Sequence, residues 1–371
     1  MYDLLIKNAR LITDEISDIV IDNKQIIEIE KNSTVEAQQT LVLDGDTYVS
    51  AGWIDDHVHC YEKMTLYYDY PDQIGVPKGV TTVIDAGTTG AENIGAFYEL
   101  AAAANTNVYA LLNISKWGIV EQDELADLAK IQTDLITKAL ADYPQFIVGI
   151  KARMSKTVIG NNGIIPLEMA KAIQAQHQQL PLMVHVGSAP PSLADVLADM
   201  SAGDVMTHCY NGKPNGILTA EGTVKDFVRA AYAKGVIFDV GHGTDSFNFK
   251  VAEAAKAAGI ICQTISTDIY HRNREVGPVY DMATTLEKML VLGYSLAEII
   301  PMVTANPAAV FKLHNKGQLA VGYDADLTIF KLVDGHKVLT DSNGNTRTTT
   351  TLIQPTQTIV GGSVYQCDSN E

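Results

Sequence analysis

The sequence predicts an α/β protein: a (β/α)8 TIM barrel with a small β-sandwich domain formed from both termini. Two observations support this prediction. Eight short apolar runs alternate with alanine-rich helical stretches in the middle of the chain, and segments of strand character lie before and after them. Strands that alternate with helices are typical of a parallel sheet with right-handed crossovers, and eight such units match the barrel.

The N-terminal segment, 1–50, is predicted to form three stretches of strand. Residues 2–12, 18–30 and 40–50 alternate apolar with polar side chains, are rich in β-branched residues, and are separated by Asn, Asp and Gly turns. This segment is expected to supply the N-terminal part of the sandwich.

The barrel is predicted over 51–316. Its eight strands are expected over 53–59, 80–87, 107–114, 146–153, 180–187, 204–210, 235–243 and 260–268. Helices are expected between them over 94–104, 126–143, 166–179, 193–200, 223–235 and 249–259. Further helices are expected over 282–294, 295–305 and 306–313. Helices of this length between buried strands favour βαβ units over an antiparallel sheet.

The C-terminal segment, 317–371, returns to strand character over 324–333, 337–340 and 358–365, interrupted by a polar turn region over 341–351. Both ends of the chain show a strand-like residue pattern, whereas the middle alternates strand-like and helix-like segments. Each end alone would bury too little apolar surface to be stable. We therefore expect them to join in one small β domain into which the barrel is inserted.

Composition excludes several classes of partner. The 371 residues carry 27 Lys+Arg against 44 Asp+Glu, a net charge of −17, so neither a nucleic acid nor an anionic membrane surface is an expected partner. The N-terminus lacks signal-peptide features, and no apolar run is long enough to span a membrane, which favours a cytoplasmic protein. The four cysteines form no CxxC pair, so no disulfide framework or thiolate zinc site is indicated.

Metal-binding side chains gather at the carboxyl ends of the predicted strands, where barrel enzymes place their catalytic residues. His57 and His59 end the first strand and point to the same side, because strand side chains repeat every two residues. His185, His208 and Asp268 end the fifth, sixth and eighth strands. Four imidazoles and a carboxylate in one pocket suit zinc or a related divalent ion.

Lys151 on the fourth strand faces the same pocket. An ammonium group beside two metal ions would be strongly repelled. The conflict disappears if buried Lys151 loses its proton and reacts with carbon dioxide to form a carbamate, whose two oxygens bridge two metals. A structural ion pair of Lys151 is the alternative.

Two further side chains are candidate substrate-binding residues. Arg153 lies on the same strand face as Lys151 and could hold a substrate carboxylate with two hydrogen bonds. His242 ends the seventh strand among glycines and could contact the substrate or a developing oxyanion. An ion pair of Arg153 with an acidic neighbour and a packing role for His242 stay open.

The order of these residues closely resembles the amidohydrolase superfamily, in its binuclear dihydroorotase-like branch. The resemblance rests on HVH at 57–59, a lysine on the fourth strand, a histidine on each of the fifth and sixth, and STD at 266–268. The terminal β segments are similar to the usual accessory sandwich of that superfamily, so the resemblance covers essentially the whole chain.

The resemblance implies two bound divalent ions, expected to be zinc. His57 and His59 with Asp268 would bind the more buried ion, His185 and His208 the outer one, and carboxylated Lys151 would bridge them. A hydroxide between the metals would be the nucleophile. Asp268 would be the catalytic residue that takes its proton and passes it to the leaving group.

Details of the motifs separate the branches of the superfamily. Dihydroorotases usually carry an arginine two residues after the second histidine, where this chain has Tyr61, and adenine deaminases usually bridge their metals with glutamate. The segments KARMS, THCYNG, FDVGHG and ISTDIY resemble a small group of deacetylases, whose members are often labelled dihydroorotase or adenine deaminase.

We therefore expect a hydrolase that removes an acyl group, expected to be acetyl, from a small carboxylate-bearing ester or amide. The alternatives are a cyclic amide or ureide hydrolase and an adenine deaminase, with the same metals. A non-catalytic scaffold is a third alternative, and the full set of six ligand positions argues against it. The partner is a small-molecule substrate. The sequence leaves the oligomeric state open, a homo-oligomer included.

Overall fold

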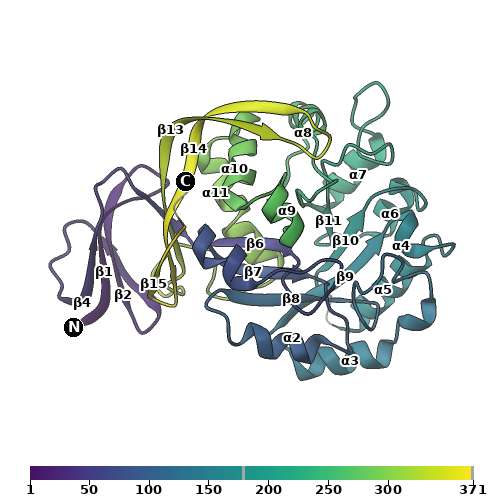
Figure 1. Ribbon diagram of the computed structural model, residues 1–371, viewed down its shortest axis with the longest axis horizontal. Helices are drawn as coiled ribbons and strands as arrows, with labels where there is room; N and C mark the ends of the chain where they lie inside the picture. Colours follow the sequence, from purple (N-terminus) through teal and green to yellow (C-terminus); the bar gives the residue numbers. More distant parts are fainter. Residues whose placement is uncertain (178–179, 369–371) are drawn as a thin grey trace.

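The computed structural model describes residues 1–177 and 180–368, which contain two sheets, and helices gather around one of them (Figure 1). Residues 178 and 179, at the end of the helix predicted over 166–179, lie outside the described residues, as do 369–371 at the end of the predicted C-terminal segment. Within the described ranges, no helix combines the length and the apolar composition that crossing a membrane would require.

One sheet is parallel and curled, and its seven strands follow one another in chain order. They are β6 (Trp53–Val58), β7 (Val80–Ala86), β8 (Asn107–Asn113), β9 (Ile147–Met154), β10 (Leu182–Val186), β11 (Val205–Thr207) and β12 (Ile237–Phe238). Each pairs in parallel with the strand before it. The expectation of a parallel sheet is therefore confirmed, although β11 and β12 are shorter than predicted.

The eighth predicted run, 260–268, forms no regular strand, but it contacts both edges of this sheet. Thr264 bridges to Asp239 just beyond β12, and Ile269 bridges to Val58 of β6, both in parallel. The Asp268 backbone N–H donates to the carbonyl of His57 at 2.7 Å. This segment therefore brings Asp268 beside the first strand of the sheet.

Helices separate the strands of the parallel sheet. The longer ones are α2 (Ile94–Ala101), α3 (Thr133–Asp142), α5 (Ile165–Gln176), α6 (Leu193–Asp199), α7 (Asp226–Lys234), α8 (Phe249–Ala257), α10 (Met282–Val291), α11 (Leu296–Met302) and α12 (Ala305–Val310). Helix α9 (His271–Val276) is as long as α12, and short helical turns are α1 (Pro71–Ile74), η1 (Val76–Lys78), η2 (Leu128–Lys130) and α4 (Lys156–Ile159). Helix α8 illustrates the local rules. Its N-cap Asn248 accepts from two backbone N–H groups, and its buried residues Phe249, Ala252 and Ala255 recur every three positions.

The other sheet contains strands from both ends of the chain. These are β1 (Tyr2–Arg10), β2 (Ile16–Asp22), β3 (Gln25–Glu30), β4 (Ala37–Val42), β5 (Tyr48–Ala51), β13 (Leu327–Thr340), β14 (Thr346–Val360) and β15 (Ser363–Gln366). The two ends meet where β5 pairs antiparallel with β13. A separate apolar core lies on this sheet, which includes Leu4, Ile6, Ile19, Val49, Leu327 and Ile359. Arrangement of these strands as a sandwich stays a prediction.

Strands β13 and β14 form a long hairpin that reaches from this sheet across α10 to α8 (Figure 1). The predicted turn region over 341–351 is too long, because β14 already begins at Thr346. Its β-branched threonines suit an extended strand. At the tip, the Ser342 hydroxyl donates to the Gly243 carbonyl at 3.0 Å. The hairpin tip therefore holds the loop that follows β12.

The hairpin tip is held mainly by Asp341, so Asp341→Ala is expected to destabilise the protein. Its buried carboxylate accepts from the backbone N–H of Phe249, Asn343 and Asn345. Leaving these donors unpaired is expected to cost about 1–3 kcal/mol, measured by urea denaturation. Asp334→Ala, at an exposed position of the same hairpin, is the control. Equal stability of the two variants would contradict this role.

Candidate metal centre

The six side chains predicted as metal ligands gather around one cavity of about 520 Å³ at the carboxyl ends of the parallel strands. Five line the cavity: His57, His59, Lys151, His185 and Asp268. The sixth, His208, stands beside His185, with its Nε2 2.8 Å from His185 Nδ1. Side chains from five separate segments of the chain therefore meet in one place.

Asp268 lies at the centre of this group. Its Oδ1 is 3.4 Å from His57 Nε2 and 3.2 Å from His59 Nε2. Lys151 Nζ is 3.1 Å from the same His57 Nε2. Donor atoms of His57, His208 and Asp268 all lie within 4.8 Å of one another, close enough to hold a metal ion. These imidazole and carboxylate donors suit zinc or a related divalent ion.

Two of the six residues have an unusual backbone. His208 and Asp268 adopt positive φ angles of 66° and 49°, a conformation that is uncommon for any residue other than Gly, although Asn, Asp and His take it more often than the rest. Such conformations cluster at functional sites, where the surrounding structure enforces them. Gly243 packs directly against Asp268, since a Cβ at this position would lie 2.3 Å from Asp268 Oδ2.

Burial keeps three imidazoles of the site, those of His57, His185 and His208, neutral at physiological pH. Loss of solvent and then the charge of Lys151 lower the pKa of His57 well below its usual value. Burial likewise lowers the pKa of His185 well below its usual value and that of His208 to about 4. A neutral imidazole carries the free lone pair that a metal ion requires.

The surroundings also shift the pKa values of Lys151 and Asp268 below their usual values. Loss of solvent lowers the pKa of Lys151 to about 7, although nearby carboxylates such as Asp268 oppose the shift. A large share of Lys151 is therefore a free amine near neutral pH. Burial raises the pKa of Asp268, but the His59 ring beside it and the surrounding basic groups outweigh this effect and hold the pKa below its usual value.

Arg153 lines the same cavity, as predicted from its place on the strand, but its guanidinium is already engaged. Nη1 lies 3.2 Å from the Glu124 carboxylate, and Nη2 donates to Gln122 at 3.1 Å. Both partners belong to the loop after β8. The structure therefore brings Arg153 to the site and pairs it with Glu124. An ion pair with an acidic neighbour was the alternative to substrate binding in the sequence analysis.

His242 is not brought to the cavity, contrary to the expectation of a substrate contact. It is fully buried, its Nε2 lies 2.8 Å from Lys288 Nζ, and its ring stacks on Phe247. The reason is local: β12 ends at Phe238, and Gly241 then adopts φ 46°, so the strand alternation does not continue to His242. This placement supports a packing role for His242 and not a contact with substrate.

Sequence reasoning missed several residues that line the cavity, because they lie in loops or, for Arg272, in the short helix α9, whose positions the sequence does not predict. These include Tyr67, Gln122, Lys213, Tyr270 and Arg272. Lys213 follows the metal-ligand strand β11, and its charge contributes to the low pKa values of His185 and His208. Among the described residues, Lys213 Nζ has no hydrogen-bond or ion-pair partner. A basic residue shortly after the THCYNG motif was the available signal.

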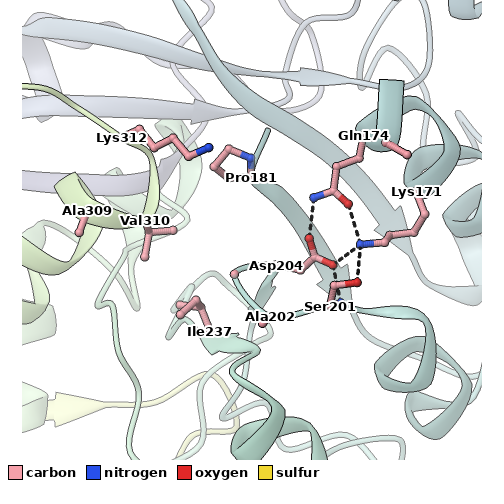
Figure 2. A pocket seen from close by; sticks show the side chains of 12 residues that line it. Lys171, Gln174, Pro181, Ser201, Ala202, Asp204, Ile237, Ala309, Val310 and Lys312 are labelled. Atoms are coloured by element: carbon pink, nitrogen blue, oxygen red, sulfur yellow. Dashed lines mark hydrogen bonds and ion pairs between the residues drawn. The ribbon is translucent and has the colours of Figure 1, made fainter. Parts of the chain in front are cut away.

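A second cavity, of about 600 Å³, opens at the amino ends of β10, β11 and β12 (Figure 2). Figure 2 shows that most of its polar groups pair with one another: Lys171 Nζ lies 2.6 Å from Asp204 Oδ2, and Gln174 donates to Asp204 Oδ1 at 2.7 Å. None of the six predicted ligands lines it. Barrel enzymes use the opposite end of their strands for catalysis, so the 520 Å³ cavity is the candidate site.

Comparison with known proteins identifies the family of this chain. A relative from Enterococcus faecalis named deacetylase is 61% identical over 365 residues, which cover 98% of this chain and 99% of the relative. The chain belongs to this deacetylase family. The family described as "Deacetylase-like composite domain" matches residues 319–366 of this family member. The expected membership of the amidohydrolase superfamily is thereby confirmed.

Solved structures similar to this deacetylase-family chain carry other names. One described as an adenine deaminase is 61% identical, with a TM-score of 0.98, over 99% of this chain and 100% of that one. Another, described as a dihydroorotase, is 32% identical, with a TM-score of 0.91, over 99% and 100%. The fold is therefore shared by family members to which different activities have been assigned.

Proposed function

We propose that this protein is a metal-dependent hydrolase that removes an acetyl group from a small carboxylate-bearing ester or amide. The observation that carries the proposal is the convergence of four histidines, one buried lysine and one aspartate on a single cavity, in a chain of the deacetylase family. The residues around this cavity fit a metal, because burial keeps the imidazoles of His57, His185 and His208 neutral.

Two divalent ions, expected to be zinc, would be held by separate parts of the cluster. His57, His59 and Asp268 would hold the more buried ion, and the adjacent pair His185 and His208 the outer one. When bound, the ions would supply an acidified water as nucleophile and polarise the scissile carbonyl. The contacts of Asp268 with both His57 and His59 support this division.

Lys151 would bridge the two ions as a carbamate. The free amine would attack carbon dioxide, form an N–C bond and release one proton, which leaves an anionic group with two oxygen donors. The pKa of about 7 supports this step, because an amine of ordinary pKa would be protonated and unreactive. Its position 3.1 Å from His57 Nε2 places the nitrogen among the other ligands.

Asp268 would move the proton that hydrolysis requires. Its side chain is 18% exposed and lines the cavity, so one carboxylate oxygen can face a bound substrate while the other contacts His59. A pKa below the usual value keeps it ionised and able to accept a proton. It would then pass the proton to the leaving oxygen or nitrogen.

The cations around the cavity would hold the substrate carboxylate. Arg153 alone is poorly placed for this role, because Glu124 and Gln122 already occupy its guanidinium. Lys213 and Arg272 also line the cavity, and neither has a side-chain partner among the described residues. We therefore propose Lys213, whose charge contributes to the low pKa values of His185 and His208, as the main contact with the carboxylate, with Arg153 as a fixed second charge.

The cavity would belong to a closed barrel of eight strands within 51–316, with 1–50 and 317–371 as the accessory β domain. The two bridges of segment 264–269, one to each edge of the parallel sheet, support closure. The sheet formed by the two ends of the chain has its own apolar core, which supports a separate accessory domain.

Adenine deamination is the second candidate function, since one similar structure is described as an adenine deaminase. Cyclic amide hydrolysis is less well supported. Tyr61 occupies the position where dihydroorotases usually carry arginine, and it is buried against Phe97 with ring centroids 5.3 Å apart. It therefore offers no charge to a substrate carboxylate.

A turnover screen of the zinc-loaded protein separates these candidates. The panel contains N-acetyl and O-acetyl derivatives of small acids, with dihydroorotate, hydantoin and adenine. We expect turnover of acetylated acids. Lys213→Met is expected to raise KM for them about tenfold, the loss of one charge-assisted hydrogen bond, with little change for neutral acetyl esters. Lys250→Met, on the exposed part of α8, is the control. Turnover of adenine alone would reject the deacetylase proposal.

A further inference from the structure

Behind His57 and His59 lie two pairs of side chains, each a threonine hydroxyl that donates to a buried carboxylate. We infer that Thr207 with Asp239, and Thr88 with Asp85, are positioning residues that hold His57 and His59 in the tautomer whose Nε2 can bind metal. The inference rests on the metal centre proposed above. It concerns how the chain prepares that centre, and the tautomers can be measured without any metal.

The first pair determines which nitrogen of His57 carries the proton. His57 Nδ1 lies 2.8 Å from Thr207 Oγ1, and this hydroxyl donates to Asp239 Oδ2 at 2.7 Å. A hydroxyl has one hydrogen, so Thr207 can only accept from His57. His57 Nδ1 therefore carries the hydrogen, and its Nε2 presents a lone pair. That Nε2 faces Lys151 and Asp268.

The second pair repeats this arrangement on the next strand. His59 Nδ1 lies 2.7 Å from Thr88 Oγ1, which donates to Asp85 Oδ2 at 2.7 Å. Asp85 also accepts from the backbone N–H of Cys60 and of Thr88 itself, both at 2.8 Å. These donors orient the carboxylate as an acceptor. His59 Nε2 is therefore the free nitrogen, and it faces Asp268.

His208 reaches the same tautomer with a simpler partner. Its Nδ1 lies 2.6 Å from the Gly241 carbonyl, which can only accept, so Nε2 again presents a lone pair. The site is tightly packed here: a Cβ on Gly241 would lie 2.2 Å from Thr207 Oγ1 and 2.8 Å from His208 Nδ1. The pair behind His57 therefore has little freedom to rearrange.

A purely structural role predicts a different pattern. A buried histidine that serves packing satisfies both ring nitrogens with protein groups that lie outside any functional site. In His57 and His59, only Nδ1 has such a partner. Their Nε2 atoms face other members of the ligand cluster instead. Partners that fix ring orientation in this way typically raise metal affinity 10–100-fold.

The first test measures the tautomers directly. Nitrogen-15 NMR of the metal-free protein labelled at histidine is expected to show His57 and His59 protonated at Nδ1, assigned with His57→Gln and His59→Gln. Thr207→Val and Thr88→Val keep the side-chain shape and remove the hydroxyl, so the signal of the corresponding histidine is expected to lose its single-tautomer signature. A majority of the Nε2-protonated form in the parent protein would overturn the inference.

The second test measures zinc affinity by competition with a chelator. Each valine variant is expected to bind zinc 10–100-fold more weakly than the parent, and Thr207→Ser and Thr88→Ser to recover most of the loss. Thr285→Val, at a buried threonine of α10, is the control for loss of a hydroxyl. Unchanged affinity in the valine variants rejects the positioning role. If the parent protein itself does not bind zinc, the proposed metal centre is rejected. The NMR measurement of the His57 and His59 tautomers then still tests the positioning role of the two threonines.

Discussion

Asp268→Asn is expected to lower kcat by roughly 10²–10⁴-fold, the range for loss of a positioned proton acceptor, while zinc stays bound. The amide can still offer an oxygen to the metal, but it cannot take up the proton released during attack. The backbone should tolerate the change, because Asn adopts positive φ nearly as readily as Asp and Asp268 has φ 49°.

The measurement pairs steady-state kinetics with metal analysis of the same sample. Asp245→Asn is the matched control, since Asp245 lines the same cavity outside the ligand cluster. A variant of Asp268 with near-parental kcat would remove the residue from the proton path. Loss of zinc together with activity would instead assign Asp268 a binding role alone.

Lys151→Met is expected to abolish activity by at least about 10³-fold, because metal chemistry depends on a complete ligand set. Methionine preserves the volume of the buried side chain but cannot form a carbamate. We expect zinc content to fall below two ions per chain, and the mass of one carbon dioxide to be present in the intact parent and absent from the variant. Two bound ions in Lys151→Met would contradict the bridging role.

The same substitution is expected to have a pH-dependent effect on the stability of the metal-free protein. The folded pKa of Lys151 is about 7, whereas the unfolded chain binds this proton up to about pH 10.5. Burial of Lys151 therefore destabilises the fold fully below pH 7 and progressively less toward pH 10.5. Lys151→Met should be more stable than the parent at pH 7, with the difference shrinking by pH 10. Lys250→Met should show no such trend.

The convergence of the six candidate ligands could be predicted because its signal is local. Alternation along a strand places His57 and His59 on one face, and the order of strands in a parallel sheet follows the order of the chain. The eighth run shows where this local reasoning stops. It contacts both sheet edges as expected, but as isolated bridges, and the positive φ of Asp268 has no signature in the sequence.

The sequence alone determined the family, the parallel sheet and the types of side chain at the site, because these follow from periodicity and chain order. Only the tertiary structure decided which side chains remain free to act. Glu124 engages Arg153, and a left-handed turn at Gly241 carries His242 away from the cavity. Hydrogen-bond partners such as Thr207, 150 positions from His57, depend on how neighbouring strands align, and that alignment is fixed only when the whole core packs.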